Sequence, residues 1–498
     1  MVFTSVSFVV FFSIFYPLLI LTPHRGRLYL LLAASLFFFG YAHPSYLWIL
    51  LLVIGISYVA GIAIASDPGR KKLYVWVSVL TLLGLLAYFK YADFLISLLI
   101  DAGNALNHPL SIKPLGILLP IGISFFVFQA ISYIVDVYRG DKTAERNLIV
   151  LSLYKSFFPQ LVAGPIERST NLLPRLRRAF VDAGSGVLVT PEAMRSGCQL
   201  ILYGFFKKVC IADNAAVFSD HVFAAPASFG AVLAYLGVLC FAIQIYCDFS
   251  GYTDIARGIS RIMGIELMEN FRQPYLSASI REFWTRWHIS LSTWFRDYLY
   301  KPLGGNRVSY GRWMMNSFAV FLLSGLWHGA AVNFIIWGGV HGLIYMAEQT
   351  LHPYYRRLFP ERPDKPQWRR RVDHALAVLF TFHVVCFAWI FFRAATFSDA
   401  IAVIKAIVGP VYEVVTGARP PRALVEKSEF FYRASFAWVC CFSVLLSFID
   451  TNIERQNATI SRIWALAPVR WSVYATAALA IVFLGNWSNA QQFIYFQF

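Results

Sequence analysis

The sequence predicts an all-α protein that crosses a membrane many times. Of its 498 residues, 58% are hydrophobic and 14% are charged, whereas a soluble protein carries about a quarter charged residues. Apolar runs recur along the whole chain, and about 20 apolar residues span the hydrocarbon of a bilayer. We therefore expect roughly ten to twelve transmembrane helices, together with re-entrant and interfacial helices. The apolar runs lie near residues 5–22, 28–42, 47–66, 73–89, 115–137, 194–215, 228–247, 316–338, 374–392, 434–450 and 471–487.

The formal net charge of +16 does not point to a nucleic-acid partner. Basic residues sit in short loops between apolar runs, as in HRGR at 24–27 and GRKK at 69–72. Cytoplasmic loops of membrane proteins carry such an excess of Lys and Arg. We expect contact with the lipid bilayer and none with nucleic acid.

Common cofactor and metal motifs are absent from the sequence. The seven cysteines are odd in number and include no CxxC pair, so neither a disulfide framework nor a zinc site is indicated. GxGxxG, GxxxxGK[ST], HExxH, GxSxG and HxxxxD motifs are not found either. We expect no metal and no permanently bound cofactor.

The segment 277–307 predicts a helix that does not cross the membrane. Ser279 and Glu282 have the spacing of a capping box, and Pro302 ends the helix. Several arginines, together with Asp297, would be costly in hydrocarbon. We expect one continuous helix of about six turns that lies at the interface or packs near it.

The apolar stretch LLSGLWHGAAVNFIIWGGVHG, residues 322–342, contains two histidines. An ionisable residue inside a membrane segment is expensive, which makes His328 a candidate functional residue. Its neighbours Gly325 and Gly329 predict either room for a substrate or close helix packing, and we favour the first. His341 falls on a different helical face, and we expect it to have an ordinary hydrogen-bonded, structural role.

Further polar residues lie in or beside the apolar runs. Gln244 and Asp248 belong to one aromatic run. Asp213 follows Lys207 and Lys208 at a predicted membrane boundary, where lysines usually extend their charge toward water. We therefore interpret the two lysines as snorkelling side chains.

Five motifs together resemble the membrane-bound O-acyltransferase family, in particular its alginate O-acetyltransferase branch. They are FPQLVAGPIER, QIYCDFSGYTDIARG, ENFRQPYLSASI, REFWTRWHISLSTWFRDYLYKPLGGNR and LSGLWHGAAVNFIIWGGVHG. The resemblance covers residues 1–400 and weakens afterwards. It implies a membrane core of helices around a central tunnel over 1–400, followed at 401–498 by an extramembrane loop and the final transmembrane helices.

The resemblance also implies site residues. His328 matches the catalytic histidine of the family's WHG motif, and His288 matches the upstream histidine or asparagine of the catalytic pair. Asp213 matches a functional acid of the alginate branch.

The chemistry of these residue types fits that assignment. A neutral imidazole can take a proton from a hydroxyl while a thioester carbonyl is attacked. We expect His328 to act as general base or proton shuttle and His288 to orient or polarise the donor or acceptor. Asn333, Gln244 and backbone amides are candidates to bind the developing oxyanion, and Asp248 is a supporting candidate.

The implied function is acetyl transfer from cytoplasmic acetyl-CoA across the bacterial inner membrane. A periplasmic acetyltransferase of the SGNH type and the polysaccharide-export machinery would be the partners, with alginate and cellulose both open as acceptors. Basic loops at 164–180 and 301–313 are expected to attract the phosphates of coenzyme A.

Two alternatives stay open. One is transfer of D-alanine toward teichoic acid from a carrier protein. The other is a proton-coupled transporter in which His328, Asp248 and Asp254 relay protons. The sequence shows no internal repeat of the kind that many transporters contain, which argues against the second.

Overall fold

The computed structural model describes most of the chain. The described residues are 1–42, 44–161, 164–182, 189–358, 366–421, 424, 434–454, 458–487 and 492–496. Every regular element within these ranges is a helix. The predicted all-α class is confirmed.

Five helical segments within the described ranges are long and apolar enough to cross a membrane. They are Pro44–Ser66, which contains α3 (Leu47–Ser66), α4 (Lys71–Ala105), α11 (Ala231–Arg261), α16 (Gln367–Arg393) and α20 (Ala467–Leu484). In α4, only 17% of the most apolar window is buried inside the protein, so lipid must cover the remainder. A multi-pass membrane protein is thus confirmed, while the count of ten to twelve spans stays a prediction.

The helices form two compact units that interleave along the chain. The first unit comprises residues 1–201 and 252–269, and the second comprises residues 202–251 and 270–498. Helix α11 therefore contributes its first part to the second unit and its last part to the first. The division expected near residue 400 concerned the extent of the membrane core, and it stays a prediction. Residues 425–433 of the expected extramembrane loop lie outside the described ranges.

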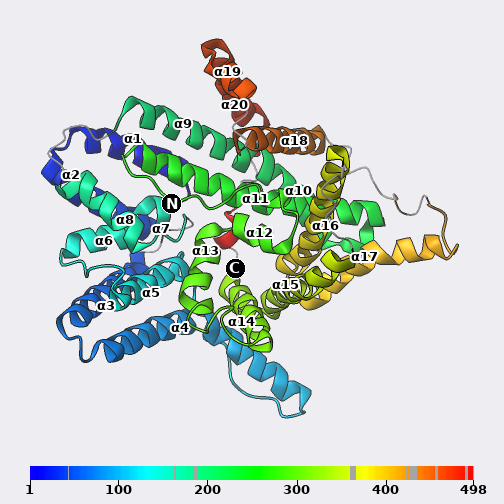
Figure 1. Ribbon diagram of the computed structural model, residues 1–498, viewed down its shortest axis with the longest axis horizontal. Helices are drawn as coiled ribbons and strands as arrows, with labels where there is room; N and C mark the ends of the chain where they lie inside the picture. The colour runs from blue at the N-terminus through cyan, green and yellow to red at the C-terminus, as the bar shows by residue number, and fades with distance from the viewer. Residues whose placement is uncertain are drawn as a thin grey trace. The chain divides into compact units, whose positions relative to one another are not determined.

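The first unit holds the helices from the first two-fifths of the chain (Figure 1). They are α1 (Val6–Leu21), α2 (His24–Ala42), α3, α4, α5 (Ile123–Arg139), α6 (Leu148–Ser156), α7 (Phe158–Leu161), α8 (Ser169–Arg177) and most of α9 (Pro191–Phe205). The second unit adds α10 (Asp213–Ala224), α12 (Ile280–Arg286), α13 (Ile289–Phe295), α14 (Tyr310–His328), α15 (Val332–Leu358), α16, α17 (Phe397–Val415), α18 (Ala434–Glu454), α19 (Ala458–Ala465) and α20.

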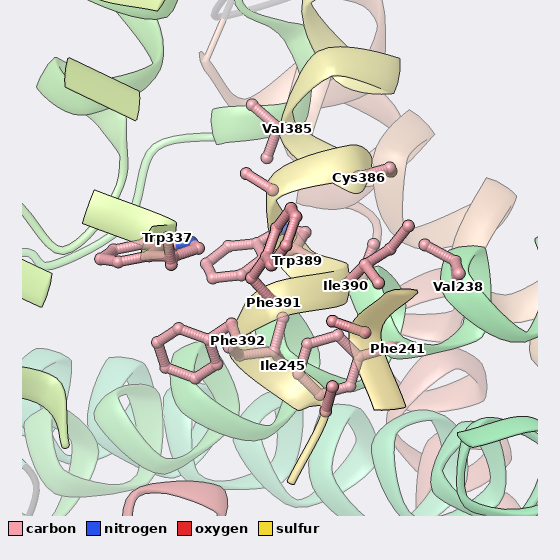
Figure 2. Packing of buried hydrophobic residues seen from close by; sticks show 14 of the residues in the cluster. Val238, Phe241, Ile245, Trp337, Val385, Cys386, Trp389, Ile390, Phe391 and Phe392 are labelled. Atoms are coloured by element: carbon pink, nitrogen blue, oxygen red, sulfur yellow. The ribbon is translucent and has the colours of Figure 1, made fainter. Parts of the chain in front are cut away.

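An aromatic core holds α11, α15 and α16 together in the second unit. The rings of Trp337 and Trp389 stack with their centroids 5.7 Å apart. Phe392 meets each of them edge-on, with 5.2 Å between centroids. Figure 2 shows these rings packed beside Phe241 and Ile245 of α11. Buried aromatic rings contribute large apolar contact areas, so this core places α15 and α16 firmly around the end of α14.

Helices α14 and α15 pack through glycine. A Cβ atom on Gly325 would lie 2.1 Å from the carbonyl oxygen of Phe334, and one on Gly338 would lie 2.3 Å from that of Phe321. A Cβ atom on Gly329 would lie 2.0 Å from the Phe334 ring. These small residues allow two backbones to approach closely. The interpretation of Gly325 and Gly329 as room for a substrate was therefore wrong.

The N-terminus of α12 has the Ser279 half of the capping box that the sequence predicts, while the Glu282 carboxylate accepts the backbone N–H of Ala278 at 2.9 Å instead of that of Ser279. The backbone N–H of Glu282 donates to the Ser279 hydroxyl at 3.1 Å. The backbone N–H of Ile280 donates to the Glu348 carboxylate of α15 at 2.8 Å. Side-chain oxygens thus satisfy donors that an uncapped helix would leave unpaired.

The single helix of six turns expected for this segment is wrong, because the chain breaks at His288. This residue has φ 43° and ψ 55° and separates α12 from α13. The backbone N–H of Ile289 donates to the carbonyl of Asn270 at 2.9 Å instead of continuing the helix. A bulky residue in the left-handed region is uncommon and is held there by its surroundings.

Candidate active site

His288 is held by one amide oxygen. Its Nδ1 atom lies 3.2 Å from Asn270 Oδ1, and the backbone N–H of Ser290 donates to the same atom at 3.1 Å. A backbone N–H can only donate, so that atom must be an acceptor oxygen. His288 therefore carries its proton on Nδ1 and donates it to Asn270, which puts the ring lone pair on Nε2.

Burial keeps the His288 ring uncharged. The residue lies outside the five candidate membrane spans, and burial lowers its pKa to about 3. Desolvation disfavours the charged form of an imidazole. At neutral pH the ring can accept a hydrogen bond at Nε2, but it is too weak a base to hold a second proton.

His328 is the last residue of α14 and is 3% exposed. Its ring lies 5.0 Å from the ring of Trp327, 5.0 Å from Trp337 and 5.4 Å from Phe392, measured between centroids. The aromatic core of Figure 2 thus forms one wall around this imidazole.

Two described side chains contact both histidine rings: Trp327, which lies 6.1 Å from His288 between centroids, and Tyr495. The Tyr495 ring centroid lies 5.5 Å from that of His328 and 6.3 Å from that of His288. Its hydroxyl is buried and makes no hydrogen bond with the residues that the structure describes. We call residues 492–496 the tyrosine segment; Figure 1 draws it in red near the labels α12 and α13. Sequence reasoning missed it, although the aromatic run FIYF at 493–496 was visible.

Asp213 and Asp248 share one buried lysine. Lys208 Nζ lies 2.7 Å from Asp213 Oδ1 and 2.8 Å from Asp248 Oδ1. The other oxygen of Asp248 accepts the backbone N–H of Ile494 at 2.8 Å. The snorkelling expected for Lys208 is wrong because its ammonium is paired inside the protein, and Lys207 is buried as well, with its ammonium 4.2 Å from the Tyr203 ring centroid.

Residues 145–395 match the membrane-bound O-acyltransferase family. The chain belongs to this family. A "probable alginate O-acetylase" of Pseudomonas putida is 41% identical over 405 residues, which cover 79% of this chain and 77% of that protein. A peptidoglycan O-acetyltransferase of Helicobacter pylori is 32% identical over 516 aligned positions, covering 96% and 92%. A teichoic acid D-alanyltransferase of Bacillus subtilis is 30% identical over 290 positions, covering 56% and 69%.

The comparisons confirm the resemblance and the acyltransferase class. Because the Helicobacter relative aligns with 96% of this chain, the similarity also extends beyond residue 400. The transporter alternative loses its support, since the chain belongs to a family of enzymes that transfer acyl groups.

Two expected site residues of this O-acyltransferase, Asn333 and Gln244, make no hydrogen bond to the histidines within the described residues. Asn333 Nδ2 donates to the carbonyl of Ala394 at 2.8 Å, which ties α15 to the end of α16. Gln244 is buried on α11, and its Oε1 has no hydrogen-bond partner within the described residues. Neither side chain is hydrogen-bonded to His288 or His328 within the described ranges, and their role at an oxyanion stays a prediction.

The side chain of His341 packs among aromatic rings. It is fully buried, and its centroid lies 5.0 Å from Trp337, 5.1 Å from Trp284 and 6.1 Å from Phe283. Its ring nitrogens make no hydrogen bond with the described part of the chain, so the hydrogen-bonded role expected for it is wrong. It supports Trp337, which in turn contacts His328.

A cavity of about 70 Å³ lies near the site in the second unit. Its lining includes Tyr246, Gln273, Tyr275 and Asp450. Aromatic contacts from Tyr246 to Phe271, and from Phe271 to His288, separate it from the histidines. In the described ranges, no group of three or more His, Cys, Asp or Glu side chains is placed to hold a metal ion.

Proposed function

We propose that this O-acyltransferase moves an acetyl group from a cytoplasmic thioester, acetyl-CoA, across the bacterial inner membrane for the O-acetylation of an exported polysaccharide. Relatives named probable alginate O-acetylases, 38 to 41% identical to this chain, support acetyl as the group and alginate as the first acceptor to test. Cellulose, the other acceptor expected from the sequence, is also tested. A periplasmic acetyltransferase of the SGNH type would receive the acetyl group and work with the export machinery.

The observation that carries this proposal is the Tyr495 ring, which has a buried hydroxyl and whose centroid lies 5.5 Å from that of His328 and 6.3 Å from that of His288. A hydroxyl becomes a good nucleophile when an adjacent base takes its proton. The phenol oxygen attacks the thioester carbonyl, the carbon–sulfur bond breaks, and the phenol proton passes through His328 to the departing thiolate. An acceptor hydroxyl then attacks the tyrosyl ester, and its proton returns through His328 to the phenol oxygen.

The two histidines have different tasks in this reaction. His328 is the proton shuttle, because the Nδ1 of His288 is committed to Asn270 and burial lowers the pKa of His288 to about 3. The Nε2 lone pair of His288 can accept a hydrogen bond from a hydroxyl and so orient it. This division agrees with the roles expected from the sequence.

Two variants test the reaction. Tyr495→Phe removes one oxygen and keeps the ring, and His328→Ala removes the shuttle. Each should lower the acetyl content of the exported polysaccharide by about 100-fold or more at normal membrane abundance, the scale of a lost general acid–base group. The exposed Tyr412 gives a matched control, because Tyr412→Phe removes a phenol hydroxyl that is remote from both histidines in sequence and 68% exposed as a residue.

A direct measurement complements these variants. Protein incubated with acetyl-CoA and no acceptor should gain the mass of one acetyl group on the peptide that contains Tyr495. Normal acetylation of the polysaccharide in Tyr495→Phe would exclude the phenol as a carrier of the group. Normal acetylation in His328→Ala would exclude the whole assignment.

The Helicobacter relative favours peptidoglycan as a further candidate acceptor, because it aligns with almost all of this chain. Measuring ester-linked acetate on alginate, cellulose and peptidoglycan in the same deletion strain distinguishes the three. The Bacillus relative keeps D-alanine open as the transferred group, and supplying a D-alanyl carrier protein in place of acetyl-CoA tests that alternative.

A further inference from the structure

We propose that Lys208 and Asp248 are positioning residues that hold the tyrosine segment against the two histidines. The inference rests on the proposed function, because it gives a task to charged groups that do not touch the reacting atoms. It assigns to this buried ion cluster a role in presenting the nucleophile.

The two oxygens of Asp248 have separate partners. Oδ1 lies 2.8 Å from Lys208 Nζ, and Oδ2 accepts the backbone N–H of Ile494 at 2.8 Å. Ile494 is 1% exposed and directly precedes Tyr495. The Asp248 carboxylate therefore connects Lys208 to the backbone beside the phenol.

The ratio of two carboxylates to one ammonium explains why the backbone N–H of Ile494 matters to Asp248. Lys208 also pairs with Asp213 at 2.7 Å, so two carboxylates share one ammonium in a buried place. A buried carboxylate is stable only when its remaining lone pairs receive hydrogen bonds. The N–H of Ile494 supplies a hydrogen bond to Asp248, and this bond favours the docked position of the tyrosine segment.

A second set of contacts ties the preceding chain to the same cluster. Asn486 donates its backbone N–H to the carbonyl of Val209 at 3.0 Å and its side-chain N–H to the carbonyl of Asp213 at 3.2 Å. Asn214 donates to the carbonyl of Leu484 at 3.1 Å. The helical residues 206–224, which carry Lys208 and Asp213, therefore hold the chain just before the tyrosine segment, while Asp248 of α11 binds the segment itself.

Phe249, next to Asp248 on α11, also packs against the tyrosine segment. Its ring centroid lies 4.4 Å from that of Tyr495, 5.5 Å from Phe493 and 4.7 Å from His288. The carboxylate sets the position of the segment along α11, and the phenyl ring supports the phenol beside the imidazole. Moving the segment by one residue would break both contacts.

The test uses variants that separate the backbone bond from the charge. Ile494→Pro removes the N–H donor and changes none of the three charged side chains, whereas Ile494→Val keeps the donor. Asp248→Ala removes the acceptor. Asp220→Ala is the matched control, since it breaks a partly exposed ion pair with Arg393, 2.6 Å long, in the same unit.

Two readouts are measured on purified full-length protein. Acetyl transfer from acetyl-CoA should fall at least tenfold in kcat for Ile494→Pro and Asp248→Ala, with little change in KM for the donor, while Asp220→Ala stays at the wild-type rate. Ile494→Val should retain at least ten times the rate of Ile494→Pro. Nitration of Tyr495 by tetranitromethane, located by mass spectrometry, should rise at least tenfold in the two defective variants.

Two other tyrosines report on the fold in the same nitration experiment. Tyr133 is fully buried and should stay protected, and Tyr412 should react in every variant. If Tyr495 stays protected in Ile494→Pro and Asp248→Ala, or if both transfer acetyl normally, the positioning role is excluded. Normal transfer by Tyr495→Phe would instead exclude the proposed nucleophile, whatever the nitration pattern shows.

Discussion

Asn270 Oδ1 lies 3.2 Å from His288 Nδ1 and sets the tautomer of that imidazole. The same oxygen receives the backbone N–H and the hydroxyl of Ser290 at 3.1 and 2.9 Å. Three donors converging on one oxygen orient the amide, and the amide orients the ring. The lone pair of His288 is thereby directed away from Asn270.

Asn270→Asp should make acetyl transfer depend on pH. A carboxylate beside His288 favours its protonated form and raises its pKa. The active form has an unprotonated Nε2, so the variant should be slow below the raised pKa and recover as pH increases through it. The rate of wild-type protein should show no such rise above pH 5, because the pKa of His288 is about 3. Rates from pH 5 to 9 measure the difference, and a profile identical to wild type would contradict the assigned tautomer.

Asn270→Ala removes the acceptor without adding charge. The ring then loses its preferred tautomer, and we expect acetyl transfer to fall about tenfold or more, in line with the contribution of an oriented acid–base group. Membrane abundance is measured in parallel. A rate within twofold of wild type would show that the amide does not position His288.

His341→Phe should retain acetyl transfer within about a factor of two at similar membrane abundance. The ring packs among Trp284 and Trp337 without a hydrogen bond to the described residues, and a phenyl ring of similar shape fills the site. His328→Phe provides the contrast and should be inactive. Loss of transfer in both variants would place His341 in the reaction.

Gly325→Ala should destabilise the α14–α15 pair by about 1–3 kcal/mol or more. Its added methyl group would meet the Phe334 carbonyl at 2.1 Å, and backbone cannot move as easily as a side chain. Gly311→Ala, in the same helix, meets nothing within 4 Å and should be neutral or stabilising. Thermal unfolding in detergent compares the two, and equal Tm values would contradict the close packing.

Ser279→Ala tests the cap of α12. Loss of the hydroxyl that accepts the Glu282 N–H should cost about 1 kcal/mol, the usual value for such a cap. Because α12 ends next to His288, a lower Tm should accompany a modest loss of rate. An unchanged Tm would mean that the Glu348 contact to Ile280 is sufficient by itself.

Part of this protein could be predicted from local sequence. The apolar runs predicted an all-α membrane protein, and the cost of an intramembrane imidazole singled out His328. The cap at Ser279 followed from residue spacing. These features depend on short stretches of chain, which periodicity and residue type describe well.

Other features depend on partners distant in sequence. The helix break at His288 follows from the bond between Ile289 and the carbonyl of Asn270. The place of Tyr495 follows from Asp248, which is 246 residues before Ile494. No local pattern encodes such pairs, so a continuous helix was expected at the first site and nothing was expected of the second.

The left-handed backbone at position 288 limits which amino acids can stand there. β-Branched side chains such as valine clash in this region of φ and ψ, whereas asparagine tolerates it among residues with a hydrogen-bonding side chain. His288→Asn would keep the junction of α12 and α13 intact while shortening the reach of its polar group. The backbone conformation therefore limits which amino acids can occupy position 288. The chemistry of the reaction selects only among those amino acids.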